Sequence, residues 1–196
     1  MPLYVFFEVK DLIERLVDRY VTKLKKNALI LEKQEEIIKF GICEIIYFVL
    51  EMFLLLGIAI FMRQFLGGIL ILLTFMPVRI YAGGVHEETR LKCIVRTSIL
   101  YLVLLYCLKY NVIPEYIRIV VMIITSVLLW KFAPIQSQNN KLDEKQVIIY
   151  RRRAIIFWCI ECILFIVGVL CQQYYVANAI SLGMCMLFYV LLFAVI

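Results

Sequence analysis

Residues 40–62 read FGICEIIYFVLEMFLLLGIAIFM, a run whose only charged side chains are Glu44 and Glu51. A helix rises about 1.5 Å per residue, so about 20 apolar residues cross a hydrocarbon core about 30 Å thick. The run is apolar on every face, whereas the strands of a membrane barrel alternate polar and apolar residues. This stretch therefore predicts a transmembrane helix and sets the fold class for the chain.

Five further apolar runs follow, and a polar gap precedes each of them. They cover residues 65–80, 94–108, 112–132, 154–171 and 174–196. The run at 94–108 is short for a span, so we expect its helix to begin before Ile94. The sequence thus predicts an all-α integral membrane protein with six transmembrane helices. We expect a single domain over residues 1–196, with a cytoplasmic segment at 1–39 and the membrane core at 40–196.

The composition excludes a soluble protein. Of the 196 residues, 64% are apolar and 18% are charged, against roughly 45–50% and about 25% in soluble domains. All but three of the 21 basic residues lie in segments 1–39, 79–96 and 131–153. Basic residues mark cytoplasmic loops, so these segments and both termini are expected in the cytoplasm. The charges are divided among gaps rather than gathered in one patch, so no nucleic-acid partner is expected.

The segment before the first span is predicted to form an amphipathic helix on the inner membrane surface. Apolar residues recur there at steps of three and four from Val9 to about Leu31: Val9, Leu12, Ile13, Leu16, Tyr20, Leu24, Ala28 and Leu31. Such a helix could be a structural collar, a dimer contact or a dock for an amphipathic partner. The pattern leaves these roles open.

One cysteine and the only histidine share a polar loop. Cys93 follows His86 by seven residues, and the other six cysteines lie in or at the ends of apolar runs. A thiol nucleophile needs a base within hydrogen-bond reach. A straight helix would separate the two residues by about 10.5 Å, so a catalytic pair requires a bend, for which Gly83 and Gly84 supply backbone freedom. The alternative is a solvated loop with an incidental cysteine.

The charges around Cys93 favour its thiolate form. Arg90, Lys92 and Arg96 lie within three residues of it, and the positive end of the third span's helix begins there. Glu87 could orient His86, as the third member of a catalytic triad does. No metal or cofactor is expected, because Cys159 and Cys162 make only half a zinc site.

These residues carry a resemblance to a known family. Arg79, Gly83, Gly84, His86 and Cys93 stand in the order Arg-x-x-x-Gly-Gly-x-His-x-x-x-x-x-x-Cys ahead of the third span. This arrangement resembles the accessory gene regulator B (AgrB) family of bacterial quorum-sensing peptidases. The Phe132-Ala133-Pro134-Ile135 stretch is similar to the Ala-Pro segment of that family. Length and span count also fit, so the resemblance covers essentially the whole chain.

The resemblance implies a cysteine endopeptidase of the bacterial cell membrane, whereas composition by itself indicates only a membrane protein. Such an enzyme removes the acidic C-terminal tail of a signal-peptide precursor and leaves a thiolactone or lactone. Cys93 would be the nucleophile and His86 the general base and acid, while Arg79, Gly83 and Gly84 shape the site. The resemblance also implies a homodimer.

The charge pattern fits such a substrate. An acidic tail would be drawn to basic residues on the cytoplasmic side, with Arg90, Arg151, Arg152 and Arg153 as candidate contacts. An amphipathic leader of the precursor would lie on the lipid of the inner leaflet. The positive-inside pattern by itself accounts for the same excess of charge.

Carboxylates inside the spans support a different function. Glu44, Glu51 and Glu161 lie within apolar runs, and ionisable residues there are costly and often functional. Protonated carboxyls hydrogen-bonded between helices are the structural alternative. If the carboxylates instead line a polar path, the chain is a transporter or exporter of a small peptide or ion. A third possibility is a non-catalytic membrane scaffold.

Overall fold

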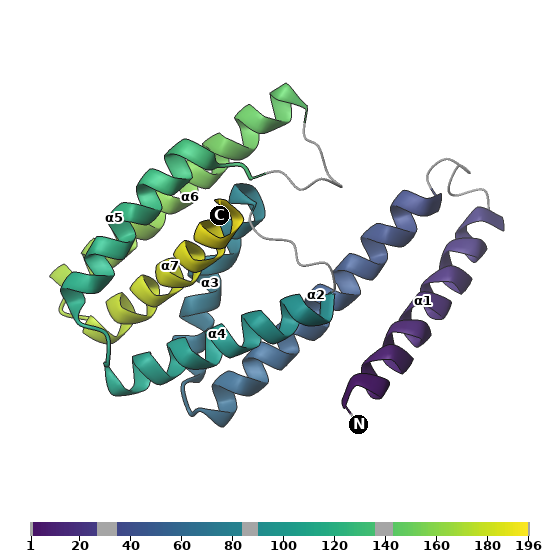
Figure 1. Cartoon of the computed structure of the whole chain (residues 1–196), viewed down its shortest axis with the longest axis horizontal. Helices are drawn as coiled ribbons and strands as arrows, with labels where there is room; N and C mark the ends of the chain where they lie inside the picture. The colour runs from purple at the N-terminus through teal and green to yellow at the C-terminus, as the bar shows by residue number, and fades with distance from the viewer. Residues whose placement is uncertain (1, 27–34, 84–89, 136–142, 196) are drawn as a thin grey trace. The chain divides into compact units, whose positions relative to one another are not determined.

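The computed structural model describes residues 2–26, 35–83, 90–135 and 143–195. These residues form helices joined by short connections, with one isolated bridge between backbone segments (Figure 1). The helices are α1 (Pro2–Lys26), α2 (Glu35–Phe61), α3 (Phe65–Ala82), α4 (Arg90–Tyr110), α5 (Glu115–Phe132), α6 (Glu144–Leu170) and α7 (Tyr174–Val195). The all-α class is therefore confirmed for the part of the chain described.

Five of these helices are long and apolar enough to cross a membrane: α2, α3, α4, α6 and α7. The chain is therefore a multi-pass membrane protein. The run expected as a sixth span, residues 112–132, does form a helix, α5. Its 18 residues include three charged ones, Glu115, Arg118 and Lys131, whereas each of those five helices contains an apolar stretch of 18 residues with at most two. The structure thus supports five of the six expected spans.

Two helices extend beyond the apolar runs that predict them. Helix α4 begins at Arg90, which confirms that it starts before Ile94. Helix α6 begins at Glu144, ten residues before the run at 154–171, and its start carries a capping box in which the Asp143 N–H donates to Gln146 Oε1 at 3.1 Å. At 27 residues α6 is about 40 Å long, longer than the hydrocarbon core.

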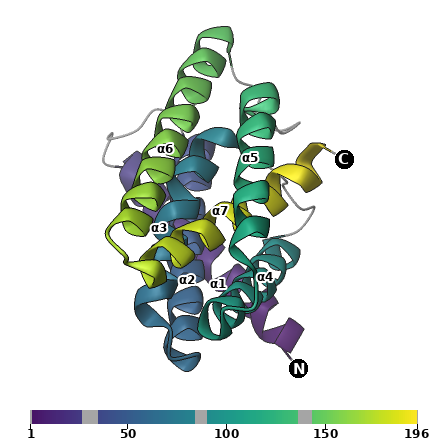
Figure 2. The same ribbon diagram turned by 90° about the vertical axis from the view of Figure 1, so that its left-hand side faces the viewer.

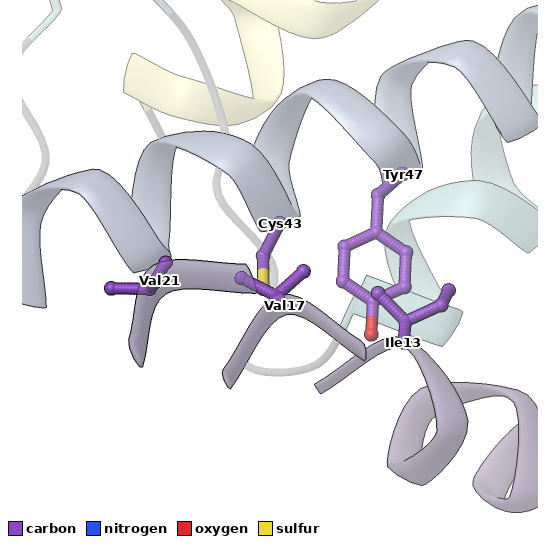
Figure 3. Packing of buried hydrophobic residues seen from close by; sticks show 5 residues of the cluster. All are labelled: Ile13, Val17, Val21, Cys43 and Tyr47. Atoms are coloured by element: carbon purple, nitrogen blue, oxygen red, sulfur yellow. The ribbon is translucent and has the colours of Figure 1, made fainter. Parts of the chain in front are cut away.

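The chain divides into two compact units, Met1–Phe53 and Leu54–Ile196, and the division falls within α2. In the first unit α1 packs along the first turns of α2 (Figure 3). The shared apolar cluster consists of Ile13, Val17, Val21, Cys43 and Tyr47. An ion pair joins Lys25 Nζ and Glu35 Oε2 at 2.9 Å, and a second joins Lys39 to Asp18.

The stripe of α1 that is buried against α2 shares only Ile13 with the apolar face expected to lie on the membrane. Leu16 and Tyr20, which belong to that expected face, are 53% and 56% exposed and do not pack against α2. The residues that pack against α2 are Ile13, Val17 and Val21, at steps of four. The reason is that the partner of α1 in this unit is a helix, which presents a narrow stripe rather than a broad surface. Whether α1 also lies on a membrane stays a prediction.

In the second unit α7 packs against α3, α5 and α6, and α4 packs mainly against α7 (Figures 1 and 2). Glycines bring α3 and α7 close together. A Cβ on Gly183 would lie 2.7 Å from Thr74 Cβ, and one on Gly67 would lie 2.5 Å from Tyr175 Oη. Small residues allow such close approach between membrane helices. The two contacts follow the same order along both helices, so α3 and α7 run parallel.

One end of this unit, which we call the turn end, consists of the connections at residues 62–64, 111–114 and 171–173. Each connection holds a residue with positive φ: Arg63 at 56°, Asn111 at 49° and Gln172 at 59°. The Tyr175 hydroxyl donates to Gln64 Oε1 at 2.7 Å, and Asn178 Nδ2 donates to Asn111 Oδ1 at 3.3 Å. The opposite end, which we call the loop end, holds the last turns of α3, α5 and α7 and the first turns of α4 and α6.

Candidate functional site

Cys93 lies in the first turn of α4, at the loop end, and its side chain is partly exposed. One turn further on, Arg96 Nε donates to the Tyr189 hydroxyl at 3.0 Å. The Arg96 guanidinium also lies 5.3 Å from the ring centre of Tyr189 and 4.6 Å from that of Phe193, within cation–π range. The start of α4 is therefore held against the C-terminal part of α7.

Gly83 is bound to the segment that follows α5. The Ile135 N–H donates to the Ala82 carbonyl at 2.8 Å, and Gly83 and Ile135 form a parallel bridge. Gly83 has φ +74° and ψ −151°, a conformation essentially restricted to glycine. A Cβ there would lie 2.2 Å from the Ile135 carbonyl oxygen. The Ala-Pro segment and the glycine pair, both noted in the sequence, thus meet at Gly83.

The last turn of α3 is held by a backbone hydrogen bond and by aromatic packing. The Arg79 carbonyl accepts the Gly83 N–H at 3.1 Å, which closes the helix, and the Arg79 side chain is half-buried. The Tyr81 ring is stacked on Phe157 and meets Tyr150 edge-on, with 5.6 Å between ring centres in both cases. The sequence analysis did not single out Tyr81, although its place two residues before the glycine pair is a signal that could have found it.

The arginine run at the start of α6 does not act as one patch. The Arg153 guanidinium lies 5.4 Å from the ring centre of Tyr81. Arg151 Nη2 donates to the Trp130 carbonyl near the end of α5, and Arg152 is exposed. Successive residues of a helix point about 100° apart, so the three side chains separate. Arg151 joins α6 to α5, and Arg153 joins α6 to α3. The sequence did not predict these structural roles.

Several predicted site residues lie outside the described residues. These are Gly84, His86 and Glu87. Arg90 begins α4, but its side chain is likewise outside the description. The pairing of Cys93 with His86, and the orientation of His86 by Glu87, therefore stay predictions. The structure describes the two anchors of the loop that carries them, Gly83 and the start of α4.

The three carboxylates that the sequence places in apolar runs are not equally buried. Glu161 on α6 is only 5% exposed, and its Oε2 has no hydrogen-bond partner among the described residues. Arg118 on α5 is also 5% exposed. Glu44 and Glu51 are half-buried. Among the residues described, no group of three His, Cys, Asp or Glu side chains could hold a metal ion.

Comparison with known proteins gives a consistent family match. The family model described as Accessory gene regulator B matches residues 17–192. An AgrB-like protein of Lactiplantibacillus plantarum is 22% identical over 141 residues, which cover 71% of this chain and 70% of that protein. The Accessory gene regulator protein B of Staphylococcus intermedius is 21% identical over 136 residues, covering 69% and 72%. No solved structure matches the chain.

Proposed function

This chain belongs to the AgrB family, and on that premise we propose that it is a membrane cysteine endopeptidase with Cys93 as its nucleophile. Membership in the family connects the chain to accessory gene regulator quorum sensing. The proposed reaction removes the C-terminal tail of an autoinducing-peptide precursor and promotes closure of a thiolactone or lactone ring.

The observation that carries the proposal is the position of Cys93. It is a partly exposed thiol in the first turn of α4, inside the residues matched by the family. The positive end of a helix dipole stabilises a thiolate, and Lys92 and Arg96 lie on either side of Cys93 in the same helix. A thiolate is the reactive form of a cysteine nucleophile.

The first chemical step is acyl transfer to sulfur. The Cys93 thiolate attacks the scissile carbonyl, and a tetrahedral intermediate forms. The C–N bond then breaks, the tail leaves as an amine protonated by His86, and the precursor remains as a thioester on Cys93. His86 acts as general base when it takes the thiol proton and as general acid when it returns it.

The second step closes the ring. A thiol within the substrate gives its proton to His86 and attacks the thioester, the new thioester replaces the old one, and Cys93 is released as a thiolate. A serine hydroxyl in place of the thiol gives a lactone. Hydrolysis competes with ring closure, so the site must keep water away from the acyl-enzyme. A site at the edge of the membrane limits the access of water to the thioester.

The remaining predicted residues take supporting roles in the proposal. Arg79, Gly83 and Gly84 shape the start of the loop that carries His86, and the bond between Ile135 and Ala82 holds that start in place. Glu87 orients His86. The basic candidates for the acidic tail are Arg90, Arg151, Arg152 and Arg153, of which Arg151 and Arg153 also make structural contacts within the chain. The enzyme acts as a homodimer with its site in the cytoplasm.

Thiol labelling tests the activated nucleophile without a known substrate. A small alkylating reagent is applied to the protein in detergent across pH, and each modified cysteine is identified by mass spectrometry. We expect Cys93 to react at pH values well below the ordinary thiol pKa of about 8.5, and His86→Ala to remove this reactivity. Cys171, exposed at the turn end, is the matched control for accessibility without activation. Equal pH profiles for Cys93 and Cys171 would overturn the proposal.

One observation favours a second candidate function, a transporter or exporter. Glu161 is buried within a span, and one of its carboxyl oxygens has no hydrogen-bond partner in the part of the chain that the structure describes; such residues often mark ion or proton pathways. In this case Glu161→Gln should abolish flux across vesicles while Cys93→Ala leaves it unchanged. Loss of precursor cleavage in Cys93→Ala, with flux unaffected by Glu161→Gln, would decide for the peptidase.

A further inference from the structure

A groove of about 700 Å³ lies between α5 and α6 near the loop end. It is lined by Ser126, Val127, Trp130 and Lys131 from α5 and by Arg151 from α6. The two helices pack on α7 far more than on each other, which leaves the space between them open. Its size falls within the range of small-molecule sites, about 300–1,000 Å³.

The groove has an apolar wall and a basic rim. Trp130 is 66% exposed, and Val127 is exposed beside it one turn earlier. Ser126, which lines the groove, already has a hydrogen-bond partner, because Trp158 Nε1 donates to Ser126 Oγ at 2.8 Å. Lys131 and Arg151 supply the charge. A ligand for this groove should therefore combine an apolar body with an anionic group.

The surface onto which the groove opens is apolar along the length of α5. The exposed side chains there are Ile117, Ile119, Val120, Ile123, Ile124 and Val127. In a multi-pass membrane protein such a face contacts lipid tails. Lys131, Arg151 and Trp130 then lie where the apolar face ends, as aromatic and basic residues do at the membrane interface. An occupant that enters from the bilayer meets the apolar wall first and the charge at its head.

We propose that this groove binds an anionic phospholipid. An acyl chain lies along Val127 and Trp130, and the phosphate lies between Lys131 and Arg151. One guanidinium donor of Arg151 is used by the Trp130 carbonyl, and a guanidinium carries five, so donors remain for phosphate. Basic pockets between helices on the cytoplasmic side bind anionic headgroups. An acidic peptide would use the charge but not the apolar wall, so the lipid fits better.

This proposal is independent of the peptidase chemistry, and the chain supplies its own probe. The sequence holds only two tryptophans, Trp130 and Trp158. The full-length protein is reconstituted in phosphatidylcholine vesicles that contain brominated phosphatidylglycerol or, at the same mole fraction, brominated phosphatidylcholine. Bromine quenches a tryptophan that it touches. We expect the brominated anionic lipid to quench more strongly, and the difference to disappear in Trp130→Phe but not in Trp158→Phe.

Charge variants identify the rim. Two basic side chains near an anionic headgroup favour it roughly tenfold or more over a zwitterionic one. Lys131→Gln combined with Arg151→Gln should remove this preference, whereas Arg152→Gln, the exposed neighbour on the same helix, should keep it. Far-ultraviolet circular dichroism of each variant verifies that the helices are intact, and Lys131→Gln alone, which leaves the Arg151 bond to Trp130 in place, should reduce the preference.

Three results would overturn the proposal. Equal quenching by both brominated lipids in the folded protein would mean that the rim does not select an anionic headgroup. If a soluble acidic peptide relieves the quenching by brominated phosphatidylglycerol at low salt, the groove is a peptide site instead. Persistence of the preference in the folded Lys131→Gln/Arg151→Gln variant would likewise exclude these two side chains as the headgroup contacts.

Discussion

The turn end and the loop end of residues 54–196 are built in different ways. At the turn end the connections are short, and each contains one residue with positive φ. At the loop end α3 and α5 are followed by longer connections, and Gly83 pairs with Ile135 across about fifty residues of sequence. The backbone of the turn end is thus closed by short local turns, to which side-chain hydrogen bonds between distant residues are added, whereas in the described part of the loop end the backbone itself is paired with a distant segment.

This difference separates stability from chemistry. The partners at the turn end are uncharged hydrogen-bonding side chains: Gln64 with Tyr175, and Asn111 with Asn178. The loop end instead holds a partly exposed thiol and several basic side chains in cation–π or carbonyl contacts. A change at the turn end should therefore affect folding modestly, while a change at the loop end should affect function.

The largest expected effect separates the two ends by their cysteines. Cys93→Ala should lower precursor cleavage by roughly a thousandfold or more, as loss of a nucleophile does. Cys171→Ala, at the turn end, should leave the rate unchanged. The measurement is release of the C-terminal tail from a precursor peptide by the enzyme in proteoliposomes, followed by mass spectrometry. Normal cleavage by folded Cys93→Ala would contradict the assignment.

Gly83→Ala should break the tertiary contact of the loop end. The substitution places a Cβ against the Ile135 carbonyl oxygen and in a backbone region that only glycine adopts readily, at a cost of roughly 3 kcal/mol. The thermal midpoint in detergent should fall, and cleavage with it. The control is Gly57→Ala, where nothing lies within 4 Å of the new Cβ, so stability should hold or rise slightly. Equal midpoints for the two variants would refute this account.

Gly183→Ala should weaken the helix pair that joins the two ends. Its Cβ would lie 2.7 Å from Thr74 Cβ and 2.8 Å from the Ile71 carbonyl oxygen, so α3 and α7 must move apart. Overpacking of this kind costs about 1–3 kcal/mol. Unfolding by increasing amounts of a denaturing detergent measures the loss in the free energy of unfolding. Gly41→Ala, at a position with open space around the new Cβ, is the control. A Gly183→Ala protein as stable as the wild type would show that the helices separate freely.

The smallest expected effect is at the turn end. Tyr175→Phe removes the hydroxyl that donates to Gln64, and an exposed hydrogen bond contributes about 0.5–1 kcal/mol. The thermal midpoint should fall by a few degrees or less, with cleavage unchanged. Tyr174→Phe, the exposed neighbour, is the control. A loss of cleavage in Tyr175→Phe without a change in stability would mean that the two ends are coupled.

Much of the helical framework could be predicted because its signal is local. The apolar run 40–62 and the run 65–80 became α2 and α3 within a few residues. The predictions were weaker where helices continue in polar sequence: α6 starts at Glu144 because of a capping box, not an apolar run. The residues of α1 that pack against α2, such as Val17, could not be chosen from the repeat alone, because that choice depends on the helix that packs against them.

The sequence by itself determined that this is an all-helical membrane protein of the AgrB family and pointed to Cys93 and His86, because hydropathy and motif spacing are read along the chain. Only the tertiary structure decided that Gly83 meets Ile135, that Arg96 lies on Tyr189 and Phe193, and that the arginine run divides between α3 and α5. These contacts join residues far apart in sequence, and their energies depend on which helices lie side by side.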